Sequence, residues 1–380
     1  MARVGLVLSG GGARAAYQVG AIRGLSEILG KQTSPFEILA GLSAGGINST
    51  ALAIHADDFP EAAEHLTDVW ASLTPDHVFR TDLPNLAALG MRWFKDVTTG
   101  GVLGPSRATH LLDTTPLREL LTRELPVSRI KQHLDSGVLH GVALTATNYL
   151  TGTTVTFFDG SSEIKQWVRH GRISQREPLG VDHVMASAAI PIFFPPVSVD
   201  GRIYGDGGVR MTAPISPAIH LGAEKIVAIG IRYYRTAEAT IAMNRDQHAA
   251  SVSVAKIVGV LLNSVFLDSL DNDLERMERI NRTLSLLPAS ERKQTPDFLR
   301  TIPVLSLRPS QDLGRLAADQ YEQFPTTLRY LLRGIGATGD SGWDLVSYVA
   351  FVPGYIANLV ELGYADTLAR STEIEAFFAD

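Results

Sequence analysis

The sequence contains no cysteine, which excludes disulfide bonds, thiolate nucleophiles and metal sites built on cysteine. It also lacks an excess of positive charge. The formal net charge is −6 at pH 7, which argues against a nucleic-acid partner and against charge-driven docking on anionic lipid. No uncharged apolar run reaches about 18 residues, so we expect no membrane-spanning helix. The apolar run at 4–8 is too short for a signal peptide. We therefore expect a cytoplasmic protein.

The composition is that of a folded globular protein. Hydrophobic residues make up 45% of the 380 positions and charged residues 19%, so the chain can bury a sizeable core. This length fits one large domain or two ordinary ones.

The segment 36–48 is the one around which the chain is organised. It predicts a short apolar strand, a tight turn of the form Gly41-Leu42-Ser43-Ala44-Gly45, and then a helix. Such a turn lifts the Ser43 hydroxyl out of the strand and places it at a helix N-terminus, where developing negative charge is stabilised. Ser43 is thus a candidate nucleophile. The alternative is a glycine-rich turn that contains an incidental serine.

A second glycine-rich stretch follows the first predicted strand, at Gly10, Gly11 and Gly12. Consecutive glycines leave backbone N–H groups free to converge on one point, as an oxyanion hole requires; one such donor contributes ~3 kcal/mol. The spacing from Gly10 to Ala15 also fits a loose dinucleotide fingerprint, but Ser43 and its glycines occupy the place where a ribose-binding acid is expected. A phosphate-binding P-loop is excluded, because no Gly-Lys-Ser/Thr follows.

The third stretch, 201–208, places Asp206 between glycines after a short strand. An aspartate there is commonly a turn residue. The functional interpretation is a carboxylate that takes the proton of Ser43. The preceding segment, 186–196, either lines an acyl-chain pocket or packs in the core beside a strand.

Taken together, the three motifs resemble those of the patatin-like phospholipases, in the same order and with the Ala-Ser-x-Ala-Ile-Pro segment before the aspartate. The resemblance covers residues 1 to about 232. It implies a serine lipid acyl hydrolase with a Ser–Asp dyad and no catalytic histidine, in which Ser43 is the nucleophile, Asp206 the base and Gly10 to Gly12 the oxyanion loop. The residues that flank these motifs are Arg14, Gly41, Gly45, Gly207 and Gly208. In this family a glycine often follows the arginine, whereas this sequence has Ala15. The departure bears on the backbone path just after Arg14 and not on the chemistry.

Alternating strand and helix patterns predict an α/β fold with a mixed central sheet sandwiched by helices. We expect a catalytic domain over 1–232 and a mostly helical C-terminal extension over 233–380 that packs on it. Runs at 141–148 and 153–158 predict a hairpin, and the apolar run 225–232 a central strand. The run 252–270 is apolar almost all round, so we expect it to form a buried helix.

Three further patterns have two interpretations each. His220 suggests a Ser–His–Asp triad, but a packed or capping histidine is favoured. The acids Asp268, Asp271 and Asp273 suggest a metal, but acids on a solvated face near a helix N-terminus are favoured. The aromatic segment 348–356 is either an exposed loop that inserts at a membrane surface or part of the core.

The expected function is therefore hydrolysis of a lipid acyl ester without metal or cofactor. The expected partners are a lipid substrate and a peripheral membrane surface, and not nucleic acid. Two alternatives stay open: a non-catalytic lipid-binding protein of the same fold, and a nucleotide-binding α/β domain.

Overall fold

The computed structural model describes residues 2–98, 109–245, 252–288, 291, 299–337 and 342–379. The strands are β1 (Val4–Leu8), β2 (Ile38–Leu42), β3 (Gly141–Asn148), β4 (Thr153–Gly160), β5 (Val168–Arg169), β6 (Arg172–Arg176), β7 (Val197–Val199), β8 (Arg202–Asp206), β9 (Lys225–Ile229) and β10 (Val304–Leu307). The helices before β9 are α1 (Ala16–Leu29), α2 (Ala44–Ile54), α3 (Phe59–Ala71), α4 (Pro75–Val78), α5 (Leu83–Thr98), α6 (Thr115–Glu124), α7 (Ser128–Asp135), α8 (Val181–Ser187) and α9 (Ser216–His220). Those after β9 are α10 (Ala237–Arg245), α11 (Val254–Phe266), α12 (Asp268–Ser285), α14 (Leu313–Ala318), α15 (Thr326–Gly334), α16 (Trp343–Val349), α17 (Pro353–Leu368) and α18 (Ser371–Ala379). Short 3₁₀ turns are η1 (Gly12–Ala15), η2 (Gly207–Val209) and η4 (Tyr321–Gln323).

The strands form one mixed sheet, ordered β10-β9-β1-β2-β3-β4-β6-β5, with the β7–β8 hairpin attached through β8 to β3. Neighbours from β10 to β3 run parallel, whereas β4 and β8 pair with β3 in the antiparallel direction. The predicted mixed α/β architecture is confirmed. The hairpin of β3 and β4 and the interior position of β9 were also predicted correctly.

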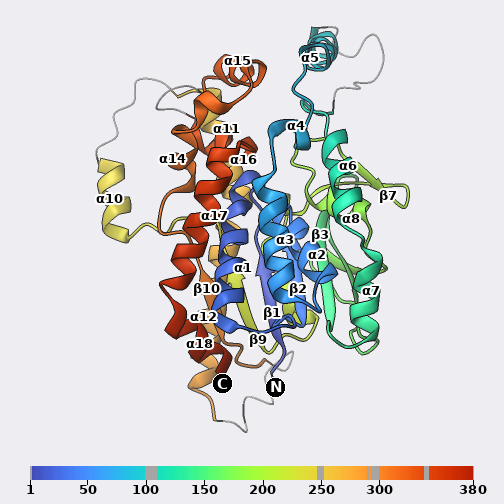
Figure 1. Cartoon of the computed structure of the whole chain (residues 1–380), viewed down its shortest axis with the longest axis vertical. Helices are drawn as coiled ribbons and strands as arrows, with labels where there is room; N and C mark the ends of the chain where they lie inside the picture. The colour runs from blue at the N-terminus through green and yellow to red at the C-terminus, as the bar shows by residue number, and fades with distance from the viewer. Residues whose placement is uncertain are drawn as a thin grey trace.

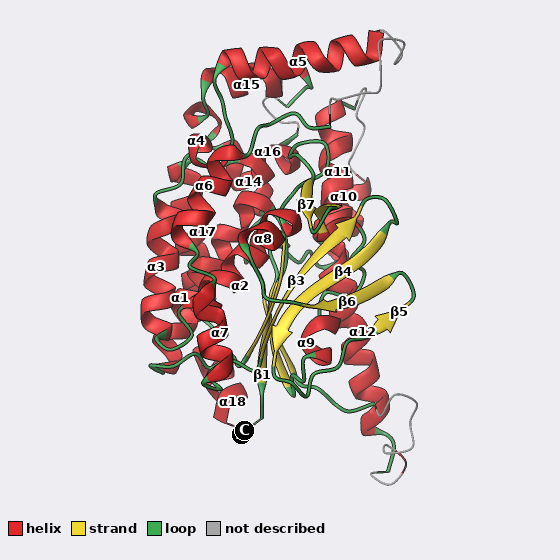
Figure 2. Cartoon of the chain, turned by 90° about the vertical axis from the view of Figure 1, so that its right-hand side faces the viewer, coloured by secondary structure: helices red, strands yellow, loops and turns green. Residues whose placement is uncertain are grey.

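Side chains of β1 show why helices cover both faces of the sheet. Leu6 and Leu8 belong to the core on the side of α1, α2 and α3, and Val7 belongs to the core built with α9 and α12. Successive side chains of a strand point to opposite faces, so an apolar parallel strand needs a helical layer on each. Figure 2 shows the sheet between these two layers.

Residues beyond 232 are built into this architecture. β10 extends the parallel sheet at β9, and α17 lies along α1 (Figure 1). The boundary at 232 stays a prediction; of the helices after it, α17 and α18 contact α1.

The predicted helix over 252–270 is wrong in two respects. It ends at Phe266, and α12 begins at Asp268. It is also not buried all round, because one side of α11 is exposed. The next helix, α12, is amphipathic, with Leu274, Met277 and Leu284 buried on one side.

The aromatic segment 348–356 is a core segment and not an exposed loop. Tyr348, Phe351 and Tyr355 are each at most 6% exposed. Insertion of this segment at a membrane surface is therefore overturned. Within the described ranges no single helix is long and apolar enough to cross a membrane; α16 and α17 pass such a test only as a pair bent by 94°.

Candidate active site

Ser43 occupies a strained turn between β2 and α2. Its backbone has φ 56° and ψ −130°, a region that residues other than glycine rarely adopt. Its carbonyl accepts the first helical hydrogen bond from Gly46 N at 2.8 Å, and its own N–H donates to Ser187 Oγ at 3.0 Å. Ser187 donates in turn to Thr145 O at 2.7 Å, which ties the turn to β3. The sequence analysis missed this role of Ser187; its one signal was the small-residue segment around it.

The glycine loop lies directly beside this serine. A Cβ added to Gly10 would lie 2.7 Å from Ser43 Cβ, so the loop is in direct contact with the serine turn and has no room for a side chain there. Gly12 has φ 56°, and a Cβ there would lie 2.1 Å from Tyr348 O. After it the chain enters η1 and then α1, with Ala15 fully buried. The alanine therefore leaves the backbone path after Arg14 helical and uninterrupted.

Asp206 ends β8 and is fully buried. Its N–H donates to Ala189 O, and its carbonyl accepts from Thr147 Oγ1, so the backbone on both sides is fixed. Oδ1 accepts a hydrogen bond from Gly208 N at 2.8 Å, whereas Oδ2 has no hydrogen-bond partner within the described part of the chain. Burial raises the pKa of the carboxyl to about 7, against the opposing effect of the Ser43 hydroxyl and the Gly208 N–H.

The remaining motif residues lie around these two side chains. Gly41 and Gly45 face each other across the serine turn, and Gly207 and Gly208 form the turn after the aspartate. Arg14 is 3% exposed and points away from the serine loop toward the C-terminal helices. Its guanidinium donates to Ser347 Oγ and Asn263 Oδ1 and to the carboxylate of Asp344, and it lies over the ring of Tyr348. The structure thus brings all the predicted motifs together.

An apolar cavity begins at Ser43. The centre of a water-sized sphere can occupy about 60 Å³ of it, and about 730 Å³ is free of protein atoms when the part open to solvent is included. It passes between α2, α3 and α6, and its walls are almost entirely aliphatic and aromatic, with Leu66, Trp70, Leu117, Leu121 and Phe351 among them. From the predicted segment 186–196, Ala188, Ile190 and Phe194 contribute to the lining. The cavity can accept a long apolar group whose reacting end lies at the serine.

Three histidines of the described ranges contact groups other than Ser43 and Asp206. His220 stacks on Trp167 with ring centroids 4.6 Å apart, so its predicted packing role is confirmed. His183 Nδ1 accepts from Gly180 N at 2.9 Å, and its other nitrogen faces Glu177. His65, which the sequence analysis did not single out, lines the cavity with Glu124, 3.9 Å from its carboxylate.

The acidic cluster of α12 is engaged by arginines. Asp268 and Asp271 pair with Arg232, and Arg308 binds Asp271 at 2.8 Å. Asp273 is 5% exposed, and its Oδ2 accepts a hydrogen bond from Ile215 N at 3.0 Å. The expectation of a solvated acidic face is therefore wrong for Asp273.

Comparison with known proteins identifies the family. The model for patatin-like phospholipases matches residues 6–219, more than half of the chain. This protein belongs to the patatin-like phospholipase family. The matched region contains the glycine loop, Ser43 and Asp206.

Two relatives show how far the likeness extends. An uncharacterised NTE family protein of Mycobacterium tuberculosis is 26% identical over 234 residues, which cover 60% of this chain and 49% of that protein. A cGAMP-activated phospholipase of Pseudomonas aeruginosa is 27% identical over 210 residues, or 55% of this chain and 53% of that protein. The chain thus spans about half the length of the curated relatives it matches.

Solved structures give weaker likenesses. Human GIVD cytosolic phospholipase A2 has a TM-score of 0.45 and 12% identity, covering 100% of this chain and 60% of that one. VipD from Legionella pneumophila has a TM-score of 0.39 and 14% identity, with coverages of 98% and 67%.

Proposed function

We propose that this protein is a serine lipid acyl hydrolase that cleaves acyl esters of phospholipids or related lipids through an acyl-enzyme on Ser43. The observation that carries the proposal is the meeting of three features. The Ser43 hydroxyl lowers the pKa of the buried Asp206 carboxyl, against the larger effect of burial. The glycine loop lies against the same serine, and an apolar cavity starts there. Membership of the patatin-like phospholipase family supports it.

The reaction needs these residues in named roles. Ser43 Oγ attacks the ester carbonyl carbon while its proton passes to Asp206 Oδ2, the oxygen without another hydrogen-bond partner among the described residues. The N–H groups of Gly10, Gly11 and Gly12 stabilise the oxyanion. When the C–O bond breaks, the leaving alkoxide takes the proton from Asp206. Water then attacks the acyl-enzyme, Asp206 accepts its proton, and Ser43 recovers that proton as the fatty acid leaves.

Burial explains how an aspartate serves as the base. A carboxylate with an ordinary pKa near 3.9 is poorly matched to a serine hydroxyl at neutral pH. A pKa of about 7 makes Asp206 a stronger base while part of the population is still ionised at pH 7.

The cavity supports a lipid as the substrate class. Almost all its lining is apolar, which suits an acyl chain; one methylene transferred from water contributes about 0.8 kcal/mol. A cytoplasmic location stays a prediction, which fractionation of cells that express the protein tests.

The experiment combines labelling with turnover. Wild-type protein is treated with a fluorescent fluorophosphonate, the modified peptide is mapped, and hydrolysis of p-nitrophenyl esters and phosphatidylcholine is measured. We expect a single label on Ser43 and activity on both substrates. A folded protein that neither labels nor hydrolyses any ester would instead be a non-catalytic lipid-binding protein of this fold.

A further inference from the structure

One side of α11 is apolar and exposed. Val254, Ile257, Val260 and Leu261 are each between 52% and 59% exposed. Their spacing of three to four residues places them on one side of the helix. The opposite side is buried, which explains why the sequence predicted burial all round: the helix is apolar on both sides. A contiguous apolar face of this kind indicates a partner.

The end of α15 lies beside the first turn of α11 and adds further exposed apolar side chains. Ala255 N donates to Ile335 O at 2.9 Å, which holds the two segments together. On α15, Tyr330 is 78% exposed, and Ile335 just after it is 36% exposed. We call the following residues the α11–α15 surface: Val254, Ile257, Val260, Leu261, Tyr330 and Ile335.

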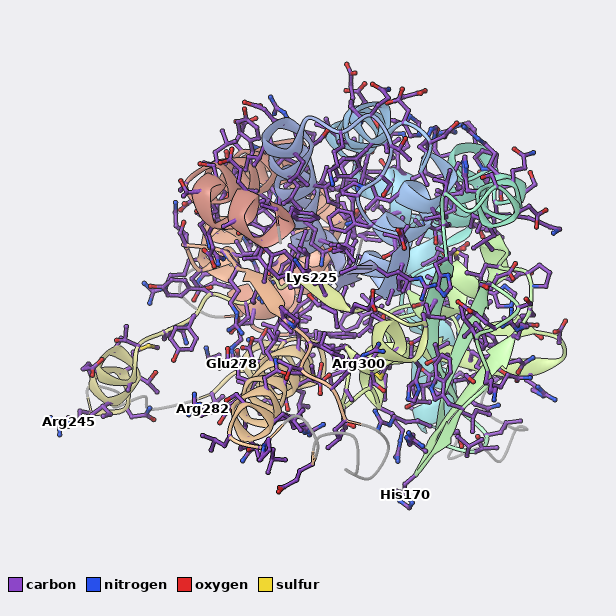
Figure 3. All side chains as sticks on the ribbon, turned by 90° about the horizontal axis from the view of Figure 1, so that it is seen from below. His170, Lys225, Arg245, Glu278, Arg282 and Arg300 are labelled. Carbon is purple, nitrogen blue, oxygen red and sulfur yellow. The ribbon has the colours of Figure 1, made fainter. Side chains whose placement is uncertain are left out.

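The charges of these helices suit a lipid bilayer. Neither α11 nor α15 contains an acidic residue, although the whole chain carries a net charge of −6. Their charged residues are Lys256, Arg329 and Arg333. Aliphatic side chains enter the boundary between headgroups and acyl chains, where tyrosine is also favoured. Lys256 pairs with Asp344 at 3.8 Å and Arg329 pairs with Glu322, so Arg333 is the basic side chain of the three that has no ion pair among the described residues and can meet a lipid phosphate. The end of the molecule farthest from α5 and α15 carries charged side chains of both signs, among them Lys225, Glu278, Arg282 and Arg300 (Figure 3).

The same helix reaches the catalytic residues. α11 ends at Phe266, whose ring packs on Gly208 and Gly10: added Cβ atoms there would lie 2.5 and 3.4 Å from Phe266 Cδ1. Ser43 and Asp206 beneath are at most 1% exposed. The outer side of α11 is therefore exposed to a partner while its inner end covers the site. A bilayer is the partner that also holds a lipid substrate.

We propose that the α11–α15 surface is where this chain docks on a lipid bilayer. The proposal rests on the proposed function in one respect, that the substrate is a lipid. In Figure 2, α15 and α5 lie at the upper end of the molecule with α11 below them. The Ser43 turn follows the C-terminal end of β2, at Leu42. Docking there brings the bilayer to the serine end of the sheet.

Vesicle binding tests the surface without requiring turnover. The Ser43→Ala protein is mixed with sucrose-loaded vesicles of phosphatidylcholine, and of phosphatidylcholine with one quarter phosphatidylglycerol, and the bound fraction is measured by sedimentation. We expect Ile257→Ser with Leu261→Ser to lower the partition coefficient at least about tenfold. The matched control is Leu150→Ser with Val168→Ser, which removes side chains that are 79% and 71% exposed elsewhere on the surface. We expect a change of less than about twofold for the control.

Several outcomes overturn the docking proposal. One is equal binding by the two double variants, and another is no vesicle binding by the parent protein. A third is a dimer that dissociates on Ile257→Ser with Leu261→Ser in analytical ultracentrifugation, since the surface would then join two copies. If the double variant fails to fold, Ile257→Gln and Val260→Gln are measured singly. Vesicle binding without any esterase activity in the wild type would contradict the proposed function and leave the docking proposal standing.

Discussion

Arg14 Nε donates to Ser347 Oγ at 2.7 Å, which joins the glycine loop beside Ser43 to a helix 333 positions later in the chain. The arginine is 3% exposed, and its other nitrogens bind Asn263 and Asp344. One side chain thus fixes the loop on α11 and α16. The loop that is proposed to hold the oxyanion is therefore held by residues far outside its own motif.

Arg14→Gln is expected to destabilise the protein by about 3–5 kcal/mol, because it takes the guanidinium from the acceptors Ser347 and Asn263 and leaves Asp344 with the more distant cation, Lys256 at 3.8 Å. Urea unfolding followed by circular dichroism measures the effect. The matched control is Arg23→Gln, which removes an exposed pair between α1 and Glu361; an exposed pair contributes about 0–1 kcal/mol. Equal unfolding midpoints for the two variants would show that the contacts of Arg14 with Ser347, Asn263 and Asp344 are not a major source of stability.

Ser43→Ala is expected to remove ester hydrolysis by at least about 10³-fold while the protein stays folded, because the turn needs a small residue and only the chemistry needs the hydroxyl. Release of p-nitrophenol and a thermal melt are recorded for the wild type and for Ser43→Ala. Ser49→Ala is the control: that serine is also buried, six positions along in α2, and its Oγ has no hydrogen-bond partner within the described residues. Substantial hydrolysis by a folded Ser43→Ala protein would remove the serine as nucleophile.

Asp206→Asn is expected to lower kcat/KM by roughly 10²–10⁴-fold with substrate binding retained, because an amide cannot accept the proton. His183→Gln and His220→Gln are expected to cost no more than a few-fold, since each contacts other groups. His248→Gln belongs to the same series, although it lies outside the described residues. A well-folded histidine variant as inactive as Asp206→Asn would replace the dyad with a triad.

The pH dependence follows from the raised pKa of Asp206, about 7 in the folded protein against 3.8 ordinarily. The base must be ionised, so kcat/KM is expected to rise from pH 5 to 8 with a midpoint near 7. Between the two pKa values the folded state binds more protons than the unfolded state, so this group lowers stability as pH rises through that window. The destabilisation is on the order of a few kcal/mol once ionisation is complete.

The Tm of Asp206→Asn relative to wild type is therefore expected to increase from pH 5 to pH 8. Calorimetry at both pH values measures it. A Tm difference independent of pH, together with a flat pH profile of kcat/KM, would contradict a raised pKa.

Leu121→Trp is expected to shorten the acyl chains that the enzyme accepts, because Leu121 is buried in the cavity wall. Excluding about four methylenes would lower kcat/KM for a long-chain ester roughly 200-fold. Activity on p-nitrophenyl acetate in the same variant is the control and should change little. An unchanged preference across esters of two to sixteen carbons would mean that the chain lies elsewhere.

The sequence alone determined much of the catalytic part. The motifs around Gly10, Ser43 and Asp206 are local: glycines, a serine and an aspartate at strand ends require the same turns wherever the rest of the chain lies. Strand and helix periods likewise predicted the mixed sheet and its two helical layers. These signals lie within a few residues, so one sequence is enough to detect them.

Only the tertiary structure decided which apolar surfaces are covered. The segments 252–270 and 348–356 are both apolar, yet α11 keeps one side exposed while the aromatic segment is buried. Hydrophobicity indicates that a side chain favours burial, but the partner that buries it is set by contacts between residues far apart in the chain. For the same reason the sequence did not predict the hydrogen bond of Ser187 to the serine turn, the place of His65 in the cavity wall, or the hydrogen bond between Arg14 and Ser347. The pKa of Asp206 also depends on burial, which no neighbour in sequence reveals.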